Sequence, residues 1–136
     1  MQAFVECEAD PPIRRKYNPV SFKLEMEQVV NAAYPYPYGF IPGTVGEDGD
    51  PLDCYLITNQ PIRHGILIAC EPLGTIQFHE GNELDYKVLM KVEGDLPGDI
   101  EMAGERIKNF IRDLFKLNPQ IVVAFGFDLD QAQTVE

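Results

Sequence analysis

Residues 52 to 92 contain four short apolar segments with turn-forming residues between them: Leu52-Asp-Cys-Tyr-Leu-Ile57, Ile66-Leu-Ile-Ala-Cys70, Thr75-Ile-Gln-Phe78 and Tyr86-Lys-Val-Leu-Met-Lys-Val92. Segments of this length and composition are typical of buried strands. Because these strands follow one another without helices between them, they favour a small barrel or sandwich over alternating βαβ units.

Two further strands are predicted nearer the N-terminus, over Ala3–Cys7 and Val20–Met26. In the second, every other residue from Val20 onward is apolar, which predicts one buried face. The segment between them, residues 10–19, is bounded by prolines and carries the densest basic cluster, Arg14-Arg15-Lys16. We predict that it is a loop. Residues 34–53 hold four prolines and four glycines, which predicts mostly turns and irregular backbone.

Helical periodicity is clear in one segment. From Ile100 to Leu117 apolar residues recur every three or four positions, Asp99 is a suitable N-cap, and Asn118-Pro119 ends the pattern. Residues 121–127 are predicted to form a last strand, and the acidic tail, residues 128–136, is assigned a short second helix as an option. We therefore predict a mainly β fold of the α+β class. Its core is a small, closed, five-stranded OB-like β-barrel with one long helix packed outside it.

Size, charge and cysteine content limit the function. The 136 residues suit one domain, and 45% hydrophobic with 24% charged residues is ordinary for a globular chain. A net charge of −11 argues against a nucleic-acid partner, whose phosphates need cations. No apolar run is long enough to span a bilayer, and the N-terminus lacks the pattern of a secretory signal. Three cysteines without a CxxC pair argue against a disulfide scaffold or structural zinc. We expect a cytoplasmic protein with neither a nucleic-acid nor a membrane partner.

The most informative segment for chemistry is Asp48-Gly49-Asp50-Pro51-Leu52-Asp53. Its three aspartates would repel one another unless a cation lay among them, and carboxylate oxygens are the hard ligands that Mg²⁺, Mn²⁺ and Ca²⁺ prefer. A solvated acidic turn is the alternative interpretation. A calcium EF-hand is excluded, because counting from Asp48 places Asp53 and Asn59 where glycine and glutamate are required. Asp53 also begins an apolar strand, which would hold its carboxylate rigidly.

A second acidic patch, residues 80–87, ends in Asp85-Tyr86-Lys87. Asp85 and Lys87 are two positions apart, so they share one face if the segment is a strand. A carboxylate beside an ammonium suits a site for a metal and its bound phosphate, but taken alone the pair is better explained as an exposed ion pair. Residues 34–42 alternate tyrosine and proline, which suits aromatic core, polyproline-type structure or a tyrosine hydroxyl that contacts phosphate.

Together, three motifs resemble the soluble, magnesium-dependent inorganic pyrophosphatases of family I, in the single-domain bacterial form. They are Tyr38-Gly-Phe-Ile-Pro42, Asp48-Gly-Asp-Pro-Leu-Asp53 and Asp85-Tyr-Lys87, and their separations match that family. The resemblance extends from Glu6 to Phe127 and implies one pyrophosphatase-like domain over residues 1–136. The implied reaction is hydrolysis of pyrophosphate to two phosphates by a metal-activated water. Mg²⁺ is the implied cofactor, with Mn²⁺ or other divalent ions as alternatives and Ca²⁺ as an expected inhibitor. The implied assembly is a homo-oligomer, with a hexamer favoured.

The resemblance also implies metal ligands, position by position. Asp48, Asp53 and Asp85 correspond to ligands of the activating metal pair. Glu80 stands where the family has an aspartate for the substrate-borne metal, and Glu6 resembles the N-terminal glutamate of that second set.

The remaining implied roles concern the reacting groups. Asp50 corresponds to the residue that takes a proton from the attacking water. Lys16, Tyr38 and Lys87 correspond to residues that bind phosphate.

Three positions depart from the family pattern. Met26 occupies the place of an arginine, Asn18 stands where glutamate is usual, and the family's Tyr-Lys pair is absent or reduced to Phe115-Lys116. The phosphate-binding set is therefore thinner than the metal set. Two alternatives follow: an enzyme of the same fold for another phosphoanhydride, or a catalytically weakened metal-binding relic.

Overall fold

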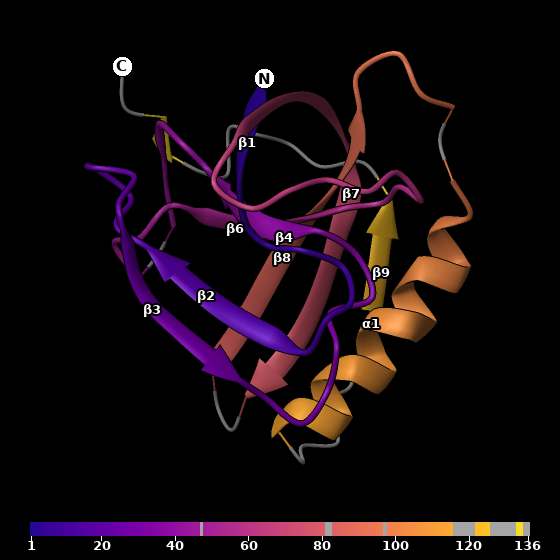
Figure 1. Ribbon diagram of the computed structural model, residues 1–136. Coiled ribbons are helices and arrows are strands. Elements are labelled where there is room, and N and C mark those ends of the chain that lie inside the picture. Colours follow the sequence, from indigo (N-terminus) through magenta and orange to yellow (C-terminus); the bar gives the residue numbers. More distant parts are fainter. Residues whose placement is uncertain (47, 81–82, 97, 116–121, 126–132, 135–136) are drawn as a thin grey trace.

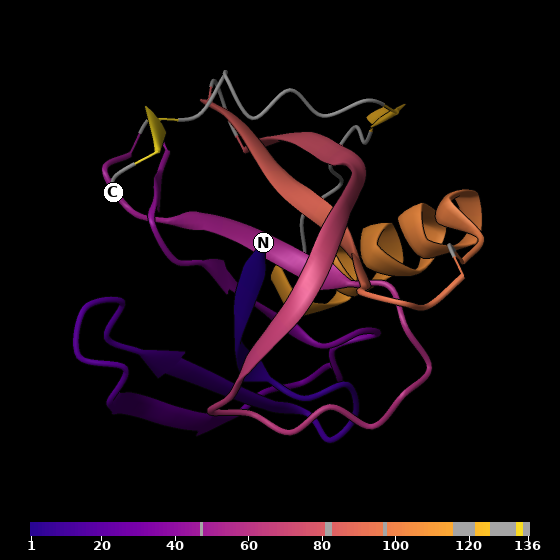
Figure 2. The ribbon, with the colours of Figure 1, turned by 90° about the horizontal axis from the view of Figure 1, so that it is seen from above.

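The protein is described by a computed structural model over residues 1–46, 48–80, 83–96, 98–115, 122–125 and 133–134. Five strands pair in the closed order β1 (Gln2–Cys7), β4 (Tyr38–Ile41), β6 (Leu52–Leu56), β8 (Glu83–Val92), β7 (Leu67–Glu80) and back to β1 (Figures 1 and 2). Neighbours are antiparallel except β6 and β8, which are parallel. The prediction of a closed, five-stranded OB-like fold is confirmed.

Two of the predicted strands are parts of one longer strand. The segments beginning at Ile66 and Thr75 both belong to β7, which is continuous over 14 residues. A bulge between Pro72 and Gly74 lets a proline lie inside the strand. Before the bulge β7 pairs with β1, and after it with β9 (Val122–Phe125), which confirms part of the last predicted strand.

The basic segment was wrongly predicted to be a loop. Residues Ile13–Tyr17 form β2, which pairs with β3 (Leu24–Val29) in a separate two-stranded ribbon. Figure 2 shows this ribbon on one side of the closed ring. One of the three charged residues of β2 is paired with an acid across the ribbon: Arg15 Nε lies 2.8 Å from Glu27 Oε2.

The strand predicted over Val20–Met26 begins only at Leu24. The preceding residues form a turn that the Asn18 side chain stabilises, since its Oδ1 accepts hydrogen bonds from the amides of Val20 and Ser21. Phe22 then takes a left-handed conformation, with φ of 58°. The alternation that begins at Val20 therefore does not define a buried face.

The proline- and glycine-rich segment contains more strand than predicted. Besides β4, it forms β5 (Thr44–Val45), which pairs with β10 (Gln133–Thr134). Gly39 permits β4 to lie close to β1, because a Cβ there would meet the Phe4 carbonyl oxygen. The optional helix predicted for the tail is wrong at Gln133–Thr134, because these residues form a strand. Residues 128–132 and 135–136 lie outside the described residues.

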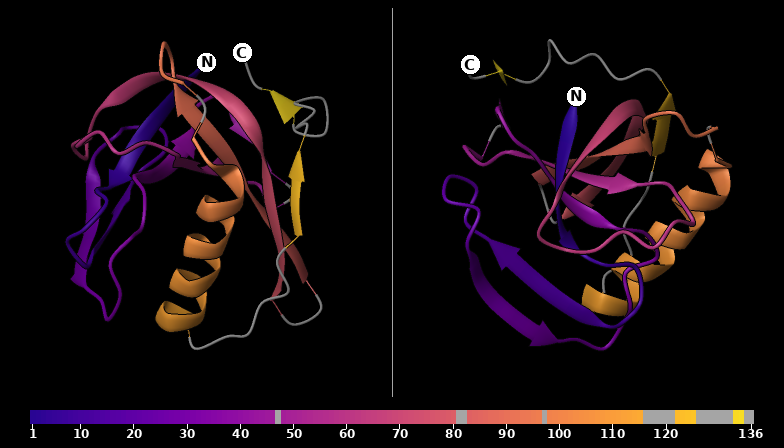
Figure 3. Two further views of the ribbon diagram at one scale, coloured as in Figure 1. Left: turned by 90° about the vertical axis from the view of Figure 1, so that its right-hand side faces the viewer. Right: turned by 45° about the horizontal axis from the view of Figure 1, so that its top comes forward.

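The predicted helix is α1 (Ile100–Phe115), and Asp99 is its N-cap, because Asp99 Oδ1 accepts a hydrogen bond from the Met102 amide. The predicted end at Asn118-Pro119 lies outside the described residues. The helix runs along the outside of the ring (Figure 3). Within the described residues, no helix has both the length and the apolar character that crossing a membrane requires.

Alternate residues of the ring strands divide into two cores. One side of the strands gathers small and aliphatic residues from all five, including Val5, Cys54 and Met90. The other side, with Tyr55 and Leu89, packs against the apolar face of α1. Strands fixed on both faces provide rigid positions for the polar residues at the edge of the ring.

Candidate active site

A cavity of about 190 Å³ lies where the β2–β3 ribbon faces the ring. Its lining comes from β1, β2, β4, β6 and the loops between them: Glu6, Arg14, Arg15, Lys16, Tyr17, Pro19, Tyr34, Tyr38, Phe40, Asp48, Asp50, Pro51 and Asp53. Six of the nine residues predicted for the site are in this set: Glu6, Lys16, Tyr38, Asp48, Asp50 and Asp53. We call this cavity the acidic cleft.

Lys87 connects the acidic cleft to the Asp85-Tyr86-Lys87 motif. Its Nζ donates hydrogen bonds of 3.0 Å to Asp53 Oδ2 and to the Tyr38 hydroxyl, and lies 3.8 Å from Asp85 Oδ2. The parallel pairing of β6 with β8 produces this contact, since Cys54 lies opposite Val88 and so places their neighbours Asp53 and Lys87 side by side. Three of the predicted residues therefore lie around one ammonium group.

The charge states of this group follow from its burial. Burial alone lowers the pKa of Lys87, but the Asp53 carboxylate and its other neighbours outweigh that effect, and the pKa is raised. Burial, reinforced by the Asp53 charge, also raises the pKa of Tyr38 well above its ordinary value. At neutral pH the site therefore presents an ammonium and a neutral phenol, both able to donate hydrogen bonds to an anion.

Glu6 reaches the cleft because of a bulge in β1. The register with β4 shifts between Val5 and Cys7, which leaves Glu6 without a partner in the ladder. Bulges commonly redirect a side chain in this way. Glu6 is buried, and its Oε2 accepts a 2.8 Å hydrogen bond from the Tyr17 amide. Burial, with repulsion from Asp53, raises its pKa to about 7, although the Tyr17 hydrogen bond and nearby cations oppose the rise.

The acidic loop presents Asp48 and Asp50 at the exposed edge of the cleft. Asp48 Oδ1 accepts a 3.0 Å hydrogen bond from the Asp50 amide, and Gly49 takes a φ of 86° that glycine adopts without strain. A hydrogen bond of 2.7 Å from the Gly46 amide to the Asp50 carbonyl closes the loop. The Asp50 carboxylate itself faces solvent, where a water molecule can reach it.

A second basic side chain, that of Arg14, lies close to Lys16. Arg14 is two positions earlier on β2, so both side chains are on the same face of the strand. Both line the cleft, and their charges favour the ionised form of Glu6. Arg14 and Arg15 both line the cleft, and the family resemblance assigned neither of them a role. The basic cluster was visible in the sequence, but the shared face follows only once the segment is known to be a strand.

The donor chemistry of the site suits a hard divalent cation. Glu6, Asp48, Asp50 and Asp53 offer carboxylate oxygens to one cavity, with Asp85 beside them. Within the described part of the chain, no three His, Cys, Asp or Glu side chains converge as a group that could hold a metal. Between Asp53 and Asp85 the positive charge is supplied by Lys87. The ligand types therefore fit a divalent metal, while closing them around an ion would require side-chain rearrangement.

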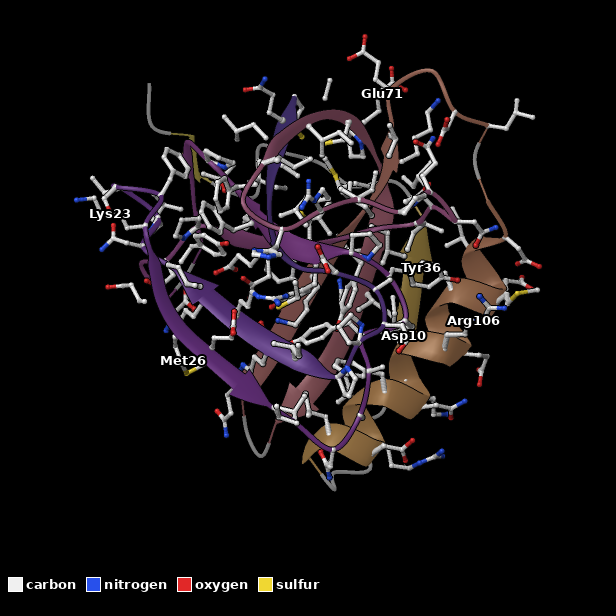
Figure 4. All side chains as sticks on the ribbon, viewed as in Figure 1. Asp10, Lys23, Met26, Tyr36, Glu71 and Arg106 are labelled. Carbon is white, nitrogen blue, oxygen red and sulfur yellow. The ribbon has the colours of Figure 1, made fainter. Side chains whose placement is uncertain are left out.

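Several predicted positions are not among the described residues that line the cleft. Glu80 is the last residue of β7 and pairs with Glu83 of β8, and its side chain is outside the described part of the structure. The described residues that line the cleft do not include Met26, which pairs with Lys16 across the ribbon. In Figure 4 the Met26 side chain lies at the left edge of the molecule. Asn18 stabilises the turn after β2, Phe115 ends α1, and Lys116 is outside the described residues.

Comparison with known proteins identifies the family. Residues 3–118 match the family model described as inorganic pyrophosphatase. The inorganic pyrophosphatase of Nanoarchaeum equitans is 33% identical over 129 residues, which cover 86% of this chain and 79% of that protein. The enzyme of Synechocystis sp. is 33% identical over 118 residues, covering 80% and 70%.

Solved structures agree with these sequence matches. The crystal structure of an inorganic pyrophosphatase from Neisseria gonorrhoeae superposes with a TM-score of 0.75 at 25% identity, covering 92% of this chain and 82% of that one. The match of residues 3–118 covers well over half of the chain. The chain therefore belongs to the inorganic pyrophosphatase family.

Proposed function

We propose that this protein is a divalent-metal-dependent enzyme that hydrolyses inorganic pyrophosphate to two phosphates, acting as a single domain over residues 1–136. The observation that carries the proposal is that the carboxylates of Asp48, Asp50 and Asp53 share one cleft with Lys16 and Tyr38. Pyrophosphate hydrolysis needs neutralisation of charge on the leaving phosphate and a prepared water, with little covalent chemistry from the protein. Acidic side chains that can bind metal ions, together with basic side chains that can bind phosphate, meet that need.

The metal ligands are assigned by position and donor type. Asp48, Asp53 and Asp85 would hold the activating metal ions, and Glu6 and Glu80 would hold the metal that arrives with the substrate. When bound, divalent ions lower the pKa of a coordinated water and neutralise phosphate charge. Mg²⁺ is the ion we propose, with Mn²⁺ as a substitute and Ca²⁺ as an inhibitor.

The protein's own groups account for binding and proton transfer. Asp50, exposed at the edge of the cleft, would take the proton from the attacking water. Lys87 and Tyr38 would donate hydrogen bonds to the departing phosphate, and Lys16 would add charge from the ribbon side of the cleft. Their positions on separate, packed strands keep these donors oriented.

The setting of the enzyme is also proposed. We expect a homo-oligomer, with a hexamer favoured, and sedimentation velocity would test that assembly. A cytoplasmic location agrees with three unpaired, buried cysteines.

A phosphate-release assay tests the function directly. Wild-type protein is given Mg²⁺ and, separately, pyrophosphate, tripolyphosphate or a nucleoside triphosphate, with Asp50→Asn as the inactive control. Strong preference for pyrophosphate, lost in the control, supports the proposal. Preference for another anhydride would favour the alternative that Met26 suggests, a changed substrate on the same fold. Metal binding without any turnover would indicate a metal-binding relic.

A further inference from the structure

Tyr17 joins the ribbon to the rest of the molecule through three different groups. Its amide donates the hydrogen bond to Glu6 described above, and its ring packs edge-on against Phe4, with centroids 5.0 Å apart. Its hydroxyl lies 2.6 Å from Nδ1 of His64, on the loop between β6 and β7. Only 8% of the Tyr17 surface is exposed. The ring contact already explains the burial, so the hydroxyl contact needs a separate explanation.

The loop around His64 closely surrounds the Tyr17 hydroxyl. The His64 amide donates to Glu8 Oε2 at 3.2 Å, and the Gly65 amide donates to the Val5 carbonyl at 2.7 Å. Gly65 has a φ of 81°, and a Cβ at this position would lie 3.2 Å from the Tyr17 hydroxyl oxygen. The loop is therefore fixed both to β1 and to Glu8, the residue that follows β1, which makes His64 a firm attachment point.

The Tyr17 hydroxyl can act as the donor in this contact. Burial raises the pKa of Tyr17, so the hydroxyl keeps its proton at neutral pH. It donates to Nδ1 in the His64 tautomer whose proton is on Nε2.

Movement of Tyr17 would reach two site residues at once. Lys16 precedes it directly, and the ribbon register shifts between these two residues, so the backbone there is irregular. Glu6 depends on the Tyr17 amide for its hydrogen bond. The position of Tyr17 therefore determines the backbone position of Lys16 and the place of the Glu6 carboxylate.

We infer that Tyr17 and His64 are positioning residues for phosphate binding, which act by fixing Lys16 and Glu6 on the ribbon side of the acidic cleft. The inference rests on the proposed function for its kinetic test, and on anion binding alone for a second test. The His64 side chain acts at a distance, through the Tyr17 hydroxyl.

The kinetic test uses Tyr17→Phe, His64→Ala and the double variant, with Arg63→Gln as a matched control on the same loop. Loss of this hydrogen bond should raise KM for pyrophosphate about five-fold, with kcat changed less than about two-fold, because ground-state and transition-state binding are weakened together. The double variant should resemble the single variants, since each removes the same contact. His64→Gln, which retains a hydrogen-bonding group, should recover part of the loss.

Calorimetric titration with inorganic phosphate separates this inference from the proposed function. If wild-type protein binds phosphate but hydrolyses no pyrophosphate, the function fails while the affinities of the variants still test the positioning. Weaker phosphate binding by Tyr17→Phe and His64→Ala, but not by Arg63→Gln, supports the inference. A lower Tm with unchanged KM and phosphate affinity would show a purely structural contact and overturn it. So would a wild-type protein that neither binds phosphate nor turns over substrate.

Discussion

The ammonium of Lys87 donates a 3.0 Å hydrogen bond to Asp53 and in the same position lies 3.8 Å from Asp85. Two carboxylates that we assign to metal are thus held together by a lysine that we assign to phosphate. A metal ion bound by Asp53 must compete with that ammonium, and an ammonium released from Asp53 is available to an anion. This geometry links metal binding to phosphate binding through one side chain.

Lys87→Met should therefore strengthen metal binding and weaken catalysis. Removal of the ammonium leaves Asp53 and Asp85 without their shared cation, so Mg²⁺ affinity measured by calorimetry without substrate should rise about three- to ten-fold. Turnover of pyrophosphate should fall at the same time. Lys91→Met is the matched control, because Lys91 is on the same strand and pairs with Glu71 instead. Weaker Mg²⁺ binding by Lys87→Met would contradict this competition.

Asp50 of the acidic loop and Asp53 of β6 should respond differently to the same substitution. Asp50→Asn should lower kcat about a hundred-fold or more while metal affinity is largely retained, since the carboxylate is exposed and moves a proton. Asp53→Asn should weaken metal binding first, because it removes a ligand charge. Calorimetry and steady-state kinetics on both variants decide the matter, and an equal loss of metal affinity in the two would undo the assignment.

The buried carboxyl of Glu6 predicts a pH-dependent stability of the metal-free protein. Its pKa of about 7 exceeds the value near 4.5 expected when the chain is unfolded, so the folded state holds the proton more tightly. That contribution is complete below about pH 4.5 and is lost as the pH rises through 7. Glu6→Gln stays neutral and can still accept the Tyr17 amide.

Thermal unfolding with a chelator present measures this effect. Relative to wild type, Glu6→Gln should gain stability as the pH rises from about 4.5 to 8, by up to about 3 kcal/mol. A difference in Tm that is the same at both ends of this range would show that the Glu6 carboxyl does not titrate as described.

The features that sequence predicted best were those set by local patterns. The apolar run Leu52–Ile57 and the helical spacing after Asp99 depend on neighbours along the chain, and both elements are present in the structure. The strand Ile13–Tyr17 was missed because three of its five residues are charged, and its pairing with β3, including the Arg15–Glu27 ion pair, has no signal within the segment itself.

Contacts between strands that are distant along the chain could not be predicted from the sequence. The meeting of Lys87 with Asp53 depends on a parallel register between β6 and β8, and that of Glu6 with Tyr17 depends on a bulge in β1. Neither register nor bulge has a composition signal in these segments. The motifs therefore predicted which residues belong to the site, while tertiary pairing decided how they contact one another.

Arginines of the ribbon should have different roles despite being adjacent. Arg14 lines the cleft on the face of Lys16, so Arg14→Ala should lower kcat/KM for pyrophosphate about ten-fold through loss of a charge-assisted contact. Arg15 also lines the cleft, but its side chain is only 10% exposed and its Nε is bound to Glu27. Arg15→Ala should therefore lower Tm more than it changes KM. If instead Arg15→Ala raises KM and Arg14→Ala does not, the assignment of faces on β2 is wrong.

Met26 provides the sharpest test of whether this chain has replaced a missing arginine. It lies opposite Lys16 in the ribbon, so a guanidinium introduced there would share the face that carries Lys16 and Arg14. In a chain that still has Arg14, Met26→Arg should raise kcat/KM by less than about three-fold, because the anion already has a nearby cation. In the Arg14→Ala background the same substitution should recover most of the ten-fold loss. Met26→Leu, which preserves size without charge, should change neither background. If Met26→Arg raises kcat/KM by the same factor in the wild-type and Arg14→Ala backgrounds, an arginine at position 26 makes a separate phosphate contact. Arg14 then does not substitute for the missing arginine.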